Sequence, residues 1–452
     1  MIDKRNKIKI LHLAPHFAGG VGRVVFNYLE KVKNNSSFSH QLIGLDYTRD
    51  KIAVSSKMTN FSFRENMASN YAEILSAIAD ADITLIHWWN HPLIYDFLVR
   101  VKLPPCRLVI WSHISGFHSP MVFTDKLIRY PDFFVFTTPV SFETKEIKKL
   151  SDKQKKSLRV VWSTGGVERF KSIKPKKHSG FNVGYIGTVD YVKMHPNFLD
   201  ICNKINIPDA KFVVCGGPSD KEIKKEAKKL GIAEKFDFTG LVPDVAKQLS
   251  AFDIFGYPLN PRHYGSCDQS LQESMAAGVV PVVLENRMEK YMVKNGVTGI
   301  VAKNEYDYIL AVLKLYKNKT LRGVLSRNAR EYAIKTFSLN RLAKDWEIIF
   351  DELLANPKTP KKWQIAKSGR DITAKDVFLE SLGDYGKAFT SYCESKSKGE
   401  KNRAMQEIIK LNKSTAWRAK TRGTVHHYHS VFLNDKILAM WSRLMRNTDS
   451  KN

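Results

Sequence analysis

The residues best suited to chemistry lie between Tyr257 and Leu284, in the segment YPLNPRHYGSCDQSLQESMAAGVVPVVL. Its pattern predicts a strand, a polar loop, a short helix that begins at Ser270, a glycine stop and a second strand. A helix N-terminus presents unpaired backbone N–H groups and a positive dipole end to an anion. Glu273 adds a carboxylate one turn into the helix. Together these groups suit a nucleotide or a nucleotide-sugar, which combines phosphate with sugar hydroxyls.

Glycines follow the ends of several predicted strands, where open α/β sheets bind ligands. The segment APHFAGGVGRVVFNYLEKV places Gly20 and Gly22 before a predicted helix. That helix would bury one face, formed by Val24, Val25, Tyr28 and Leu29. As a dinucleotide fingerprint the segment is incomplete, because Val25 stands where a third glycine or alanine is needed. In the second half Gly187 and Gly216 end strands in the same way.

Short apolar strands alternate with helical segments along most of the chain, which predicts an α/β protein with two Rossmann-like parallel sheets. In the first half we expect strands in KIKILHL (from 7), HQLIGLDY (from 40), DITLIHWW (from 82), RLVIWSH (from 107), FFVFTTPV (from 133) and RVVWST (from 159). In the second half we expect them in FNVGYIG (from 181), KFVVCGG (from 211), KFDFTG (from 235), FDIFGYPL (from 252), VVPVVL (from 279) and GIVAK (from 299).

Changes in composition suggest the domain boundaries. The first sheet would occupy 1–170, and the polar, basic stretch 171–180 would be a linker. The second sheet would occupy 181–338, and a helix over 339–355 would return to the first domain. Residues 356–452 hold 20 Lys and Arg against 9 Asp and Glu, and they predict a basic helical appendage with an apolar face. Its residues His426, His427 and His429 have no Cys or acidic partner at metal-ligand spacing, so we interpret them as surface or packing residues.

The net charge of +27 over 452 residues favours anionic partners. No nucleic-acid motif is recognisable, so a phosphorylated substrate or an acidic lipid surface fits better. The densest basic stretch, Lys145–Arg159, has apolar residues among its lysines, as in a helix that lies on a membrane. A solvated surface helix is the alternative.

We find no apolar run near the ~18 residues that a membrane span needs, and no signal peptide at the N-terminus. These features predict a cytoplasmic protein. The five cysteines show neither CxxC spacing nor clustering, which favours free thiols over disulfides or a zinc site.

Five motifs in order give the chain a resemblance to GT-B glycosyltransferases, specifically glycosyltransferase family 4 (group 1 glycosyltransferases). They are GGVGR from 19, WSTGGVERF from 162, VGYIGTVDYVKMHP from 183, FVVCGGPSDKEIKKEAKKLGIAEKFDFTGLV from 212, and SLQESMAAGVVPVV from 270 with NGVTGIV from 295. The likeness covers about residues 7 to 350. It implies transfer of a sugar from a nucleotide-diphosphate donor, held mainly by the second domain, to an acceptor held by the first.

The resemblance also implies that the reaction retains the anomeric configuration and needs neither a metal nor another cofactor. Lys193 matches the family's phosphate-binding lysine, and Glu273 matches the glutamate that binds the ribose hydroxyls. The implied donor contacts further include Gly20, Gly22, Arg23, Gly187, Gly216, Gly240, Leu241, Val242, Ser270 and Leu271. Among these, Arg23 has a second interpretation, as an arginine on the helix surface.

His113, at the end of RLVIWSH, matches a family histidine near the transferred sugar and the acceptor. The alternative is a strand-end histidine that hydrogen bonds to a backbone carbonyl, and this alternative applies more strongly to His87, His91 and His118. The sequence Asp80-Ala81-Asp82 has the DxD pattern of metal-dependent enzymes of another fold. We interpret it as the end of a helix followed by the start of a strand.

Two departures from the family pattern affect the donor site. Gly265 stands where the family has a glutamate that contacts the donor sugar, and Thr188 stands where it has an arginine. The loop RHYGSCDQ would have to compensate. Our hypothesis is that Arg262 supplies positive charge and that His263 or Asp268 contacts the sugar, with Ser266 in the same loop.

The departures keep two other functions open, a catalytically inactive scaffold subunit and a nucleotide-sugar epimerase. Epimerases need acid and base groups beside the sugar carbon, and the candidates are His113 and a carboxylate near Asp268. The sequence does not identify the acceptor. A cytoplasmic, very basic family member often acts on lipid-linked or surface-polysaccharide intermediates at the inner face of the membrane, so we expect such a glycan acceptor and peripheral contact with anionic lipid.

Overall fold

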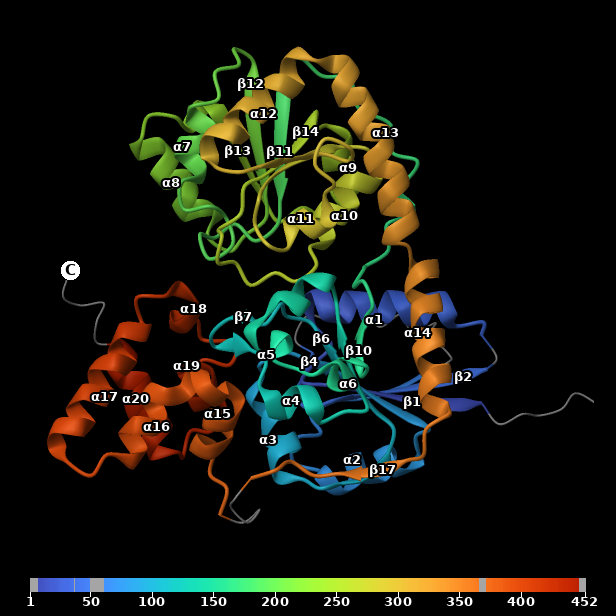
Figure 1. Ribbon diagram of the computed structural model, residues 1–452. Coiled ribbons are helices and arrows are strands. Elements are labelled where there is room, and N and C mark those ends of the chain that lie inside the picture. Colours follow the sequence, from blue (N-terminus) through green and yellow to red (C-terminus); the bar gives the residue numbers. More distant parts are fainter. Residues whose placement is uncertain (1–6, 36, 49–60, 366–370, 447–452) are drawn as a thin grey trace, which may run out of the picture. The chain divides into compact units, whose positions relative to one another are not determined.

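The computed structural model of the protein describes residues 7–35, 37–48, 61–365 and 371–446 (Figure 1). Contacts divide the chain into two units: residues 1–161 with 343–452, and residues 162–342. The stretch 171–180, for which a linker was predicted, lies inside the second unit.

The first unit is built on a parallel sheet of seven strands in the order β10-β9-β6-β4-β1-β2-β3. Its strands are β1 (Ile8–Ala14), β2 (Phe38–Gly44), β3 (Phe61–Arg64), β4 (Ile83–Trp88), β6 (Leu108–Ser112), β9 (Phe133–Phe136) and β10 (Leu158–Val160). The helices that follow these strands are α1 (Gly19–Val32), α2 (Tyr71–Asp80), α3 (Pro92–Arg100), α4 (Asp125–Arg129), α5 (Lys145–Lys148) and α6 (Asp152–Lys155), with a 3-10 turn over Pro139–Glu143. Every residue of β4, β6 and β9 is buried, as expected for central strands covered on both faces.

Two small antiparallel pairs complete this unit. β5 (Leu103–Cys106) pairs with β17 (Thr359–Lys361), and β7 (Phe117–His118) pairs with β8 (Met121–Val122). The sequence pattern missed these strands and β3, because they are four residues long or shorter and two of them contain proline.

The second unit contains a parallel sheet of six strands in the order β13-β12-β11-β14-β15-β16. Its strands are β11 (Phe181–Ile186), β12 (Ala210–Cys215), β13 (Phe236–Gly240), β14 (Ile254–Tyr257), β15 (Val280–Leu284) and β16 (Ile300–Ala302). Its helices are α7 (Phe198–Asn203), α8 (Asp220–Lys229), α9 (Val245–Ser250), α10 (Gln269–Ala276), α11 (Glu289–Met292), α12 (Glu305–Lys317) and α13 (Lys319–Thr336), with 3-10 turns over Glu168–Phe170 and Ala233–Lys235. The predicted fold class, two Rossmann-like parallel sheets with a helical C-terminal region, is confirmed.

Helix α14 (Leu339–Leu354) begins in the second unit, and from Ala343 onward its residues belong to the first unit. There Trp346 packs edge to face on Trp111, with ring centroids 5.0 Å apart. Glu352 pairs with Arg159 at 2.6 Å. The helix is therefore anchored on the first sheet by both an aromatic contact and an ion pair.

The C-terminal helices α15 (Ala374–Leu382), α16 (Lys387–Glu394), α17 (Lys398–Leu411), α18 (Thr415–Arg418), α19 (Val425–Val431) and α20 (Lys436–Arg446) belong to the first unit, with a 3-10 turn over Gly383–Gly386. Their shared core contains Phe378, Phe389 and Trp441, all fully buried. Helices α15 and α19 both contact α3, so the appendage docks on the first sheet's outer layer (Figure 1).

The basic stretch Lys145–Arg159 is not the single amphipathic helix that its spacing suggested. It forms two four-residue helices, α5 and α6, and then enters strand β10. Its apolar residues Ile147, Leu150 and Leu158 are buried in the first unit, so the surface of this stretch is polar and consists mostly of lysines. No helix among the described residues has the length and apolar character that crossing a membrane requires.

Candidate functional site

The predicted anion site forms at the carboxyl ends of β11 and β14 and at the start of α10. The helix begins at Gln269, one residue before the predicted start, with Asp268 at its N-cap. Leu271 and Glu273 are buried, and Glu273 is only 3% exposed. A guanidinium nitrogen of Arg169 lies 3.9 Å from its carboxylate. The helix thus holds a buried carboxylate just after its first turn.

Lys193 lies in the loop after β11, and its ammonium donates a hydrogen bond to Asp268. Both side chains are buried. Burial acts to lower the pKa of Lys193, but the Asp268 carboxylate and the neighbouring Tyr264 and Tyr185 outweigh it and raise that pKa above its usual value. Lys193 is therefore a fixed positive charge at the start of α10.

The second oxygen of Asp268 is buried and has no hydrogen-bond partner among the described residues, and the hydroxyl of Tyr257 is in the same condition. Buried polar atoms without partners are uncommon in folded proteins, because each costs roughly 1–3 kcal/mol. Two such oxygens next to a paired lysine indicate a place where a polar ligand supplies the missing partners.

His263 is held in the same loop by two contacts. Its Nε2 donates to Glu289, 3.0 Å from Oε1, and its Nδ1 accepts from the N–H of Gly265 at 3.0 Å. Burial acts to lower the pKa of His263, but the carboxylates of Glu289 and Asp268 together outweigh it and raise that pKa above its usual value. A Cβ on Gly265 would lie 3.0 Å from the imidazole Nδ1, so the His263 ring occupies the space that a side chain at position 265 would need.

Three ligand-type residues, His263, Asp268 and Glu289, bring one donor atom each within 4.8 Å of one another, and all three are buried. These residues could hold a cation. Asp268 is nevertheless already paired with Lys193, and His263 with Glu289. An added cation would have to compete with the Lys193 ammonium, so the cluster is better described as a network of ion pairs.

The remaining residues predicted for the donor site lie at the ends of strands of the second sheet or in the loops after them. Gly216 has φ +133°, and a Cβ there would lie 1.9 Å from the carbonyl oxygen of Gly187, so only glycine fits. Thr188 lies 3.4 Å from the hydroxyl of Tyr264, through its Oγ1. Gly240 ends β13 with φ +67°, and the next residue, Leu241, is 86% exposed. The other two, Val242 and Ser266, are half-buried and buried respectively.

Arg262 does not join the network. Its side chain is exposed, and over the described ranges it makes no hydrogen bond or ion pair; only its backbone N–H bonds to Asn260. The structure therefore brings together Lys193, Asp268 and His263 but leaves the arginine in solvent.

In the first unit, Gly20 and Gly22 lie in the first turn of α1, since the helix begins at Gly19. A Cβ on Gly22 would lie 1.8 Å from the carbonyl oxygen of Phe17. This close approach of the helix to the backbone of Phe17 requires glycine at position 22, with or without a ligand. Arg23 is half-buried next to this turn.

The two aspartates of the DxD pattern, Asp80 and Asp82, both bind Lys9. Asp80 ends helix α2 and Asp82 directly precedes strand β4, as predicted.

His113 follows β6 and is half-buried. Its Nε2 lies 3.2 Å from Nδ1 of His87, which the sequence suggested only as a structural residue. His87 is in turn bonded to His12, and His12 to His40. Sequence reasoning missed the last two; the signal that could have found them is one histidine at or near each of four successive strands.

The appendage reaches the same edge of the first sheet. The indole N–H of Trp417 donates to Ser119 Oγ at 3.2 Å, and the ring of His427 packs edge-on against His91, with centroids 4.6 Å apart. His426 bonds to Ser442 at 2.8 Å, so these histidines pack as predicted. The appendage therefore covers loops that follow β4 and β6.

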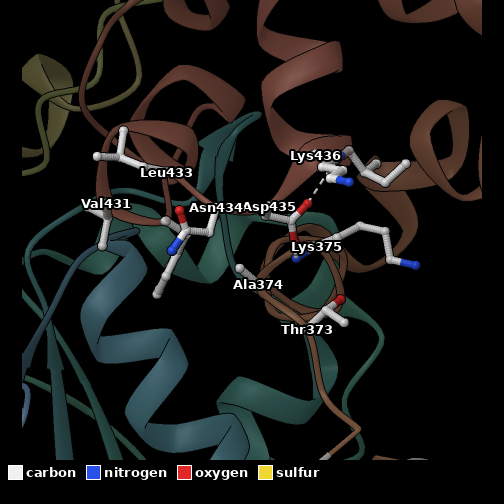
Figure 2. Close-up of a pocket in the computed structure, with 10 residues that line it drawn as sticks. Thr373, Ala374, Lys375, Val431, Leu433, Asn434, Asp435 and Lys436 are labelled. Carbon is white, nitrogen blue, oxygen red and sulfur yellow. Dashed lines mark hydrogen bonds between the residues drawn. The ribbon is translucent and has the colours of Figure 1, made fainter.

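A pocket of about 730 Å³ opens in the appendage itself, between Thr373–Lys375 and 431–437 (Figure 2). Its carboxylate, Asp435, accepts from backbone N–H groups of Lys375, Ile437 and Leu438 and so caps two helices. None of the residues predicted for the site lines this pocket.

One segment of the chain matches a known protein family, and this segment contains the ion-pair network. Residues 167–332 match the family model described as "Glycosyl transferases group 1". The match covers the sheet of the second unit with the Lys193–Asp268 pair and α10. Comparison with curated proteins finds no match.

Solved glycosyltransferase structures extend the likeness to both sheets. A glycosyltransferase from Rickettsia africae superposes with a TM-score of 0.63 at 15% identity, over 78% of this chain and 100% of that one. Anabaena HepE in complex with UDP-glucose gives 0.61 at 14%, over 76% and 100%. Sucrose-phosphate synthase from Thermosynechococcus elongatus gives 0.59 at 13%, over 77% and 100%. The TM-scores establish the fold, GT-B, whereas identities of 13% to 15% do not identify the substrates.

Proposed function

We propose that this chain is a glycosyltransferase of family 4 that moves a sugar from a nucleotide-diphosphate-sugar to a glycan acceptor. The observation that supports this most directly is the buried Lys193–Asp268 pair at the start of α10, with one carboxylate oxygen left unpartnered. The matched family segment contains all of these residues. The HepE structure, which shares the fold, is a complex with UDP-glucose.

Each part of the network has a role in this proposal. The Lys193 ammonium and the backbone N–H groups at the start of α10 stabilise the negative charge of the departing diphosphate. The free oxygen of Asp268 accepts from a hydroxyl of the donor sugar, and Glu273 accepts from the ribose. His113 acts at the first sheet, beside the transferred sugar and the acceptor. We further propose that the configuration is retained.

Positive charge from the protein itself makes a metal unnecessary for the departing diphosphate, so we propose that the reaction is metal-independent and uses no cofactor. Arg262 is exposed and free to turn toward a bound diphosphate, and this is how it would compensate for Thr188. If Arg262→Ala and Asp268→Ala both leave donor binding and turnover unchanged, this compensation is wrong.

We propose a lipid-linked or surface-polysaccharide glycan as the acceptor, reached at the inner face of the membrane from the cytoplasm. Its support is the excess of positive charge and the exposed lysines of 145–156. The contact would be electrostatic, because the apolar residues of this stretch are buried.

Product analysis with labelled nucleotide-sugars, with and without a membrane extract as a source of acceptor, tests the proposed activity. A glycosyltransferase releases nucleoside diphosphate and transfers label to the extract, with slow hydrolysis when no acceptor is present. An epimerase instead yields an epimeric nucleotide-sugar without release, and an inactive scaffold yields no product; either result would overturn the proposal.

A further inference from the structure

Four histidines form a diagonal row on one face of the first sheet. In the strand register, His40 on β2 lies opposite Ile10 on β1, and His12 follows Ile10 by two residues. His12 lies opposite Leu85 on β4, and His87 follows Leu85 by two residues. His87 in turn lies opposite Trp111 on β6, and His113 follows Trp111 by two residues. Residues two apart on a strand share a face. From each strand to the next, the row therefore moves two residues toward the carboxyl edge of the sheet, and it ends there at His113.

Hydrogen bonds join these four imidazoles into one chain. Nδ1 of His40 lies 3.0 Å from Nε2 of His12, and Nδ1 of His12 lies 3.0 Å from Nε2 of His87. Nδ1 of His87 lies 3.2 Å from Nε2 of His113. Every link thus joins an Nδ1 of one ring to an Nε2 of the next.

This regular pattern restricts the protons. A neutral imidazole carries one proton, so one ring nitrogen donates and the other accepts. A change of tautomer within the row would bring two N–H groups, or two lone pairs, face to face across a 3 Å link. All four rings must therefore carry the proton on the same nitrogen, either Nδ1 throughout or Nε2 throughout.

The surroundings keep the row neutral. Tyr28 on α1 lies edge-on to His40, with ring centroids 5.8 Å apart, and Phe17 lies edge-on to His87 at 5.9 Å. Burial lowers the pKa of His40 to about 4 and that of His113 to about 3, and it also lowers the pKa of His12 and His87 well below the usual value. The causes of these shifts are burial and the neighbouring histidines, with no carboxylate among them.

The far end of the row decides between the two arrangements. Nε2 of His40 is buried and has no hydrogen-bond partner within the described part of the chain. With the protons on Nε2, this atom would be a buried N–H without an acceptor, and such orphaned donors are rare in folded proteins. With the protons on Nδ1, it is an unused lone pair. The second arrangement is the one that the structure favours.

We propose that His40, His12 and His87 are positioning residues that fix the proton of His113 on Nδ1. Through this row, the buried His40 determines which ring nitrogen of His113 carries the proton at the edge of the sheet. In that tautomer the Nδ1 of His113 can only donate, so this nitrogen cannot act as a base toward a substrate. This inference rests on the proposed function only for the identity of that substrate.

The test is ¹⁵N NMR of the full chain with labelled histidine, which reads the protonated nitrogen of each ring without any substrate. The expected spectrum shows four neutral imidazoles at these positions, all with the proton on Nδ1. Mixed tautomers, a uniform set with the proton on Nε2, or a cationic ring would overturn the proposal.

An isosteric pair of variants tests the coupling over three links. In His40→Asn the amide nitrogen takes the place of Nδ1 and can still donate to His12, so His113 should keep its proton on Nδ1. In His40→Asp, at pH 9, the carboxylate only accepts, so His12, His87 and His113 should all move their proton to Nε2. A His113 signal that is the same in both variants would show that the row is only packed together. If His40→Asp does not fold, the spectra of the wild type and His40→Asn decide.

These outcomes separate the row from the proposed activity. A uniform set of tautomers in a protein that releases no nucleoside diphosphate would overturn the activity and leave the row intact. Mixed tautomers in an active glycosyltransferase would do the reverse.

Discussion

At the scale of single residues, the Lys193–Asp268 pair has two separable effects, on folding and on ligand binding. Lys193→Met leaves the buried Asp268 carboxylate unpaired, which should cost about 3–5 kcal/mol of unfolding free energy. The double variant Lys193→Met with Asp268→Asn removes both charges and should recover most of that loss. Urea denaturation measures both.

The same variants separate stability from ligand recognition. Both lack the ammonium that we propose contacts the diphosphate, so their affinity for UDP, GDP or ADP, whichever the wild type binds, should fall by about 10- to 100-fold. Lys228→Met, on the exposed face of α8, is the matched control and should bind as the wild type does. An unchanged affinity in the double variant would remove Lys193 from the donor site.

Protons on the histidine row also affect stability, and the sign follows from the lowered pKa values. The unfolded histidines have pKa near 6.5, whereas the folded values are about 4 for His40 and about 3 for His113. Below pH 6.5 the unfolded state binds more protons, so the stability is present above that pH and is lost as the pH falls. At pH 5 each such histidine should lower the free energy of unfolding by roughly 2 kcal/mol.

Urea denaturation at pH 7 and pH 5, followed by tryptophan fluorescence, checks this loss. His40→Asn removes one titrating ring and should reduce the loss by about that same amount of ~2 kcal/mol. A loss of equal size in the wild type and the variant would show that the folded row titrates normally.

A metal-independent reaction is the third prediction at this scale. Because Lys193 and the N-terminus of α10 supply the positive charge, treatment with EDTA followed by dialysis should change the rate of nucleoside diphosphate release by less than about twofold. The control is Mg²⁺ added back to the same sample. A rate that falls more than tenfold and returns with Mg²⁺ would assign a cation to the cluster formed by His263, Asp268 and Glu289.

At the scale of elements, sequence periodicity identified twelve of the thirteen strands of the two parallel sheets, all but β3, and the helical appendage, but it misinterpreted one basic segment. In Lys145–Arg159 the apolar residues recur at helix-like spacing, yet they are buried from two short helices and a strand. Periodicity records which residues are apolar and not which surface covers them. The histidine row was missed for a related reason, since it depends on strand order and register.

The docking of the appendage can be tested at one close approach. Gly423 has φ +74°, and a Cβ there would lie 2.6 Å from Cβ of Asn90 in the first sheet's edge. Gly423→Ala should therefore destabilise the protein, by about 1–3 kcal/mol. Gly399→Ala, in helix α17 where a Cβ meets no atom closer than 4.0 Å, should be neutral or stabilising.

Thermal unfolding of both glycine variants, together with proteolysis of the appendage, provides the measurement. Equal melting temperatures would contradict the docked position of α19 and Trp417.

At the scale of the whole molecule, the excess of positive charge predicts electrostatic attraction to anionic membranes. Each exposed lysine near such a surface contributes about 1 kcal/mol. Replacing Lys148, Lys149 and Lys153 with Gln should weaken binding to phosphatidylglycerol vesicles on the order of 100-fold, and salt should weaken binding of the wild type. The control replaces Lys224, Lys225 and Lys228 of α8. Vesicle sedimentation that is insensitive to salt would contradict this prediction.

The fold and the elements that carry the candidate site could be predicted because they follow from local patterns: buried strands, glycines at strand ends, and a helix start followed by Glu273. The loop before α10 could not, because its structure depends on contacts between distant residues. Asp268 pairs with Lys193, 75 positions away, and His263 with Glu289, 26 positions away. Arg262, by contrast, was predicted to supply charge and lies in solvent.

The central claim is that the second unit binds a nucleotide-sugar at the start of α10, and thermal-shift titration with a panel of nucleotide-sugars tests it most directly. A ligand that binds only the folded state raises the melting temperature, with about 2.7 kcal/mol of stabilisation at a hundredfold excess over its dissociation constant. We predict that at least one nucleotide-sugar produces such a shift, and that Glu273→Ala and the Lys193–Asp268 double variant each reduce it at the same ligand concentration. No shift with any member of the panel, or a shift of undiminished size in both variants, would contradict the account.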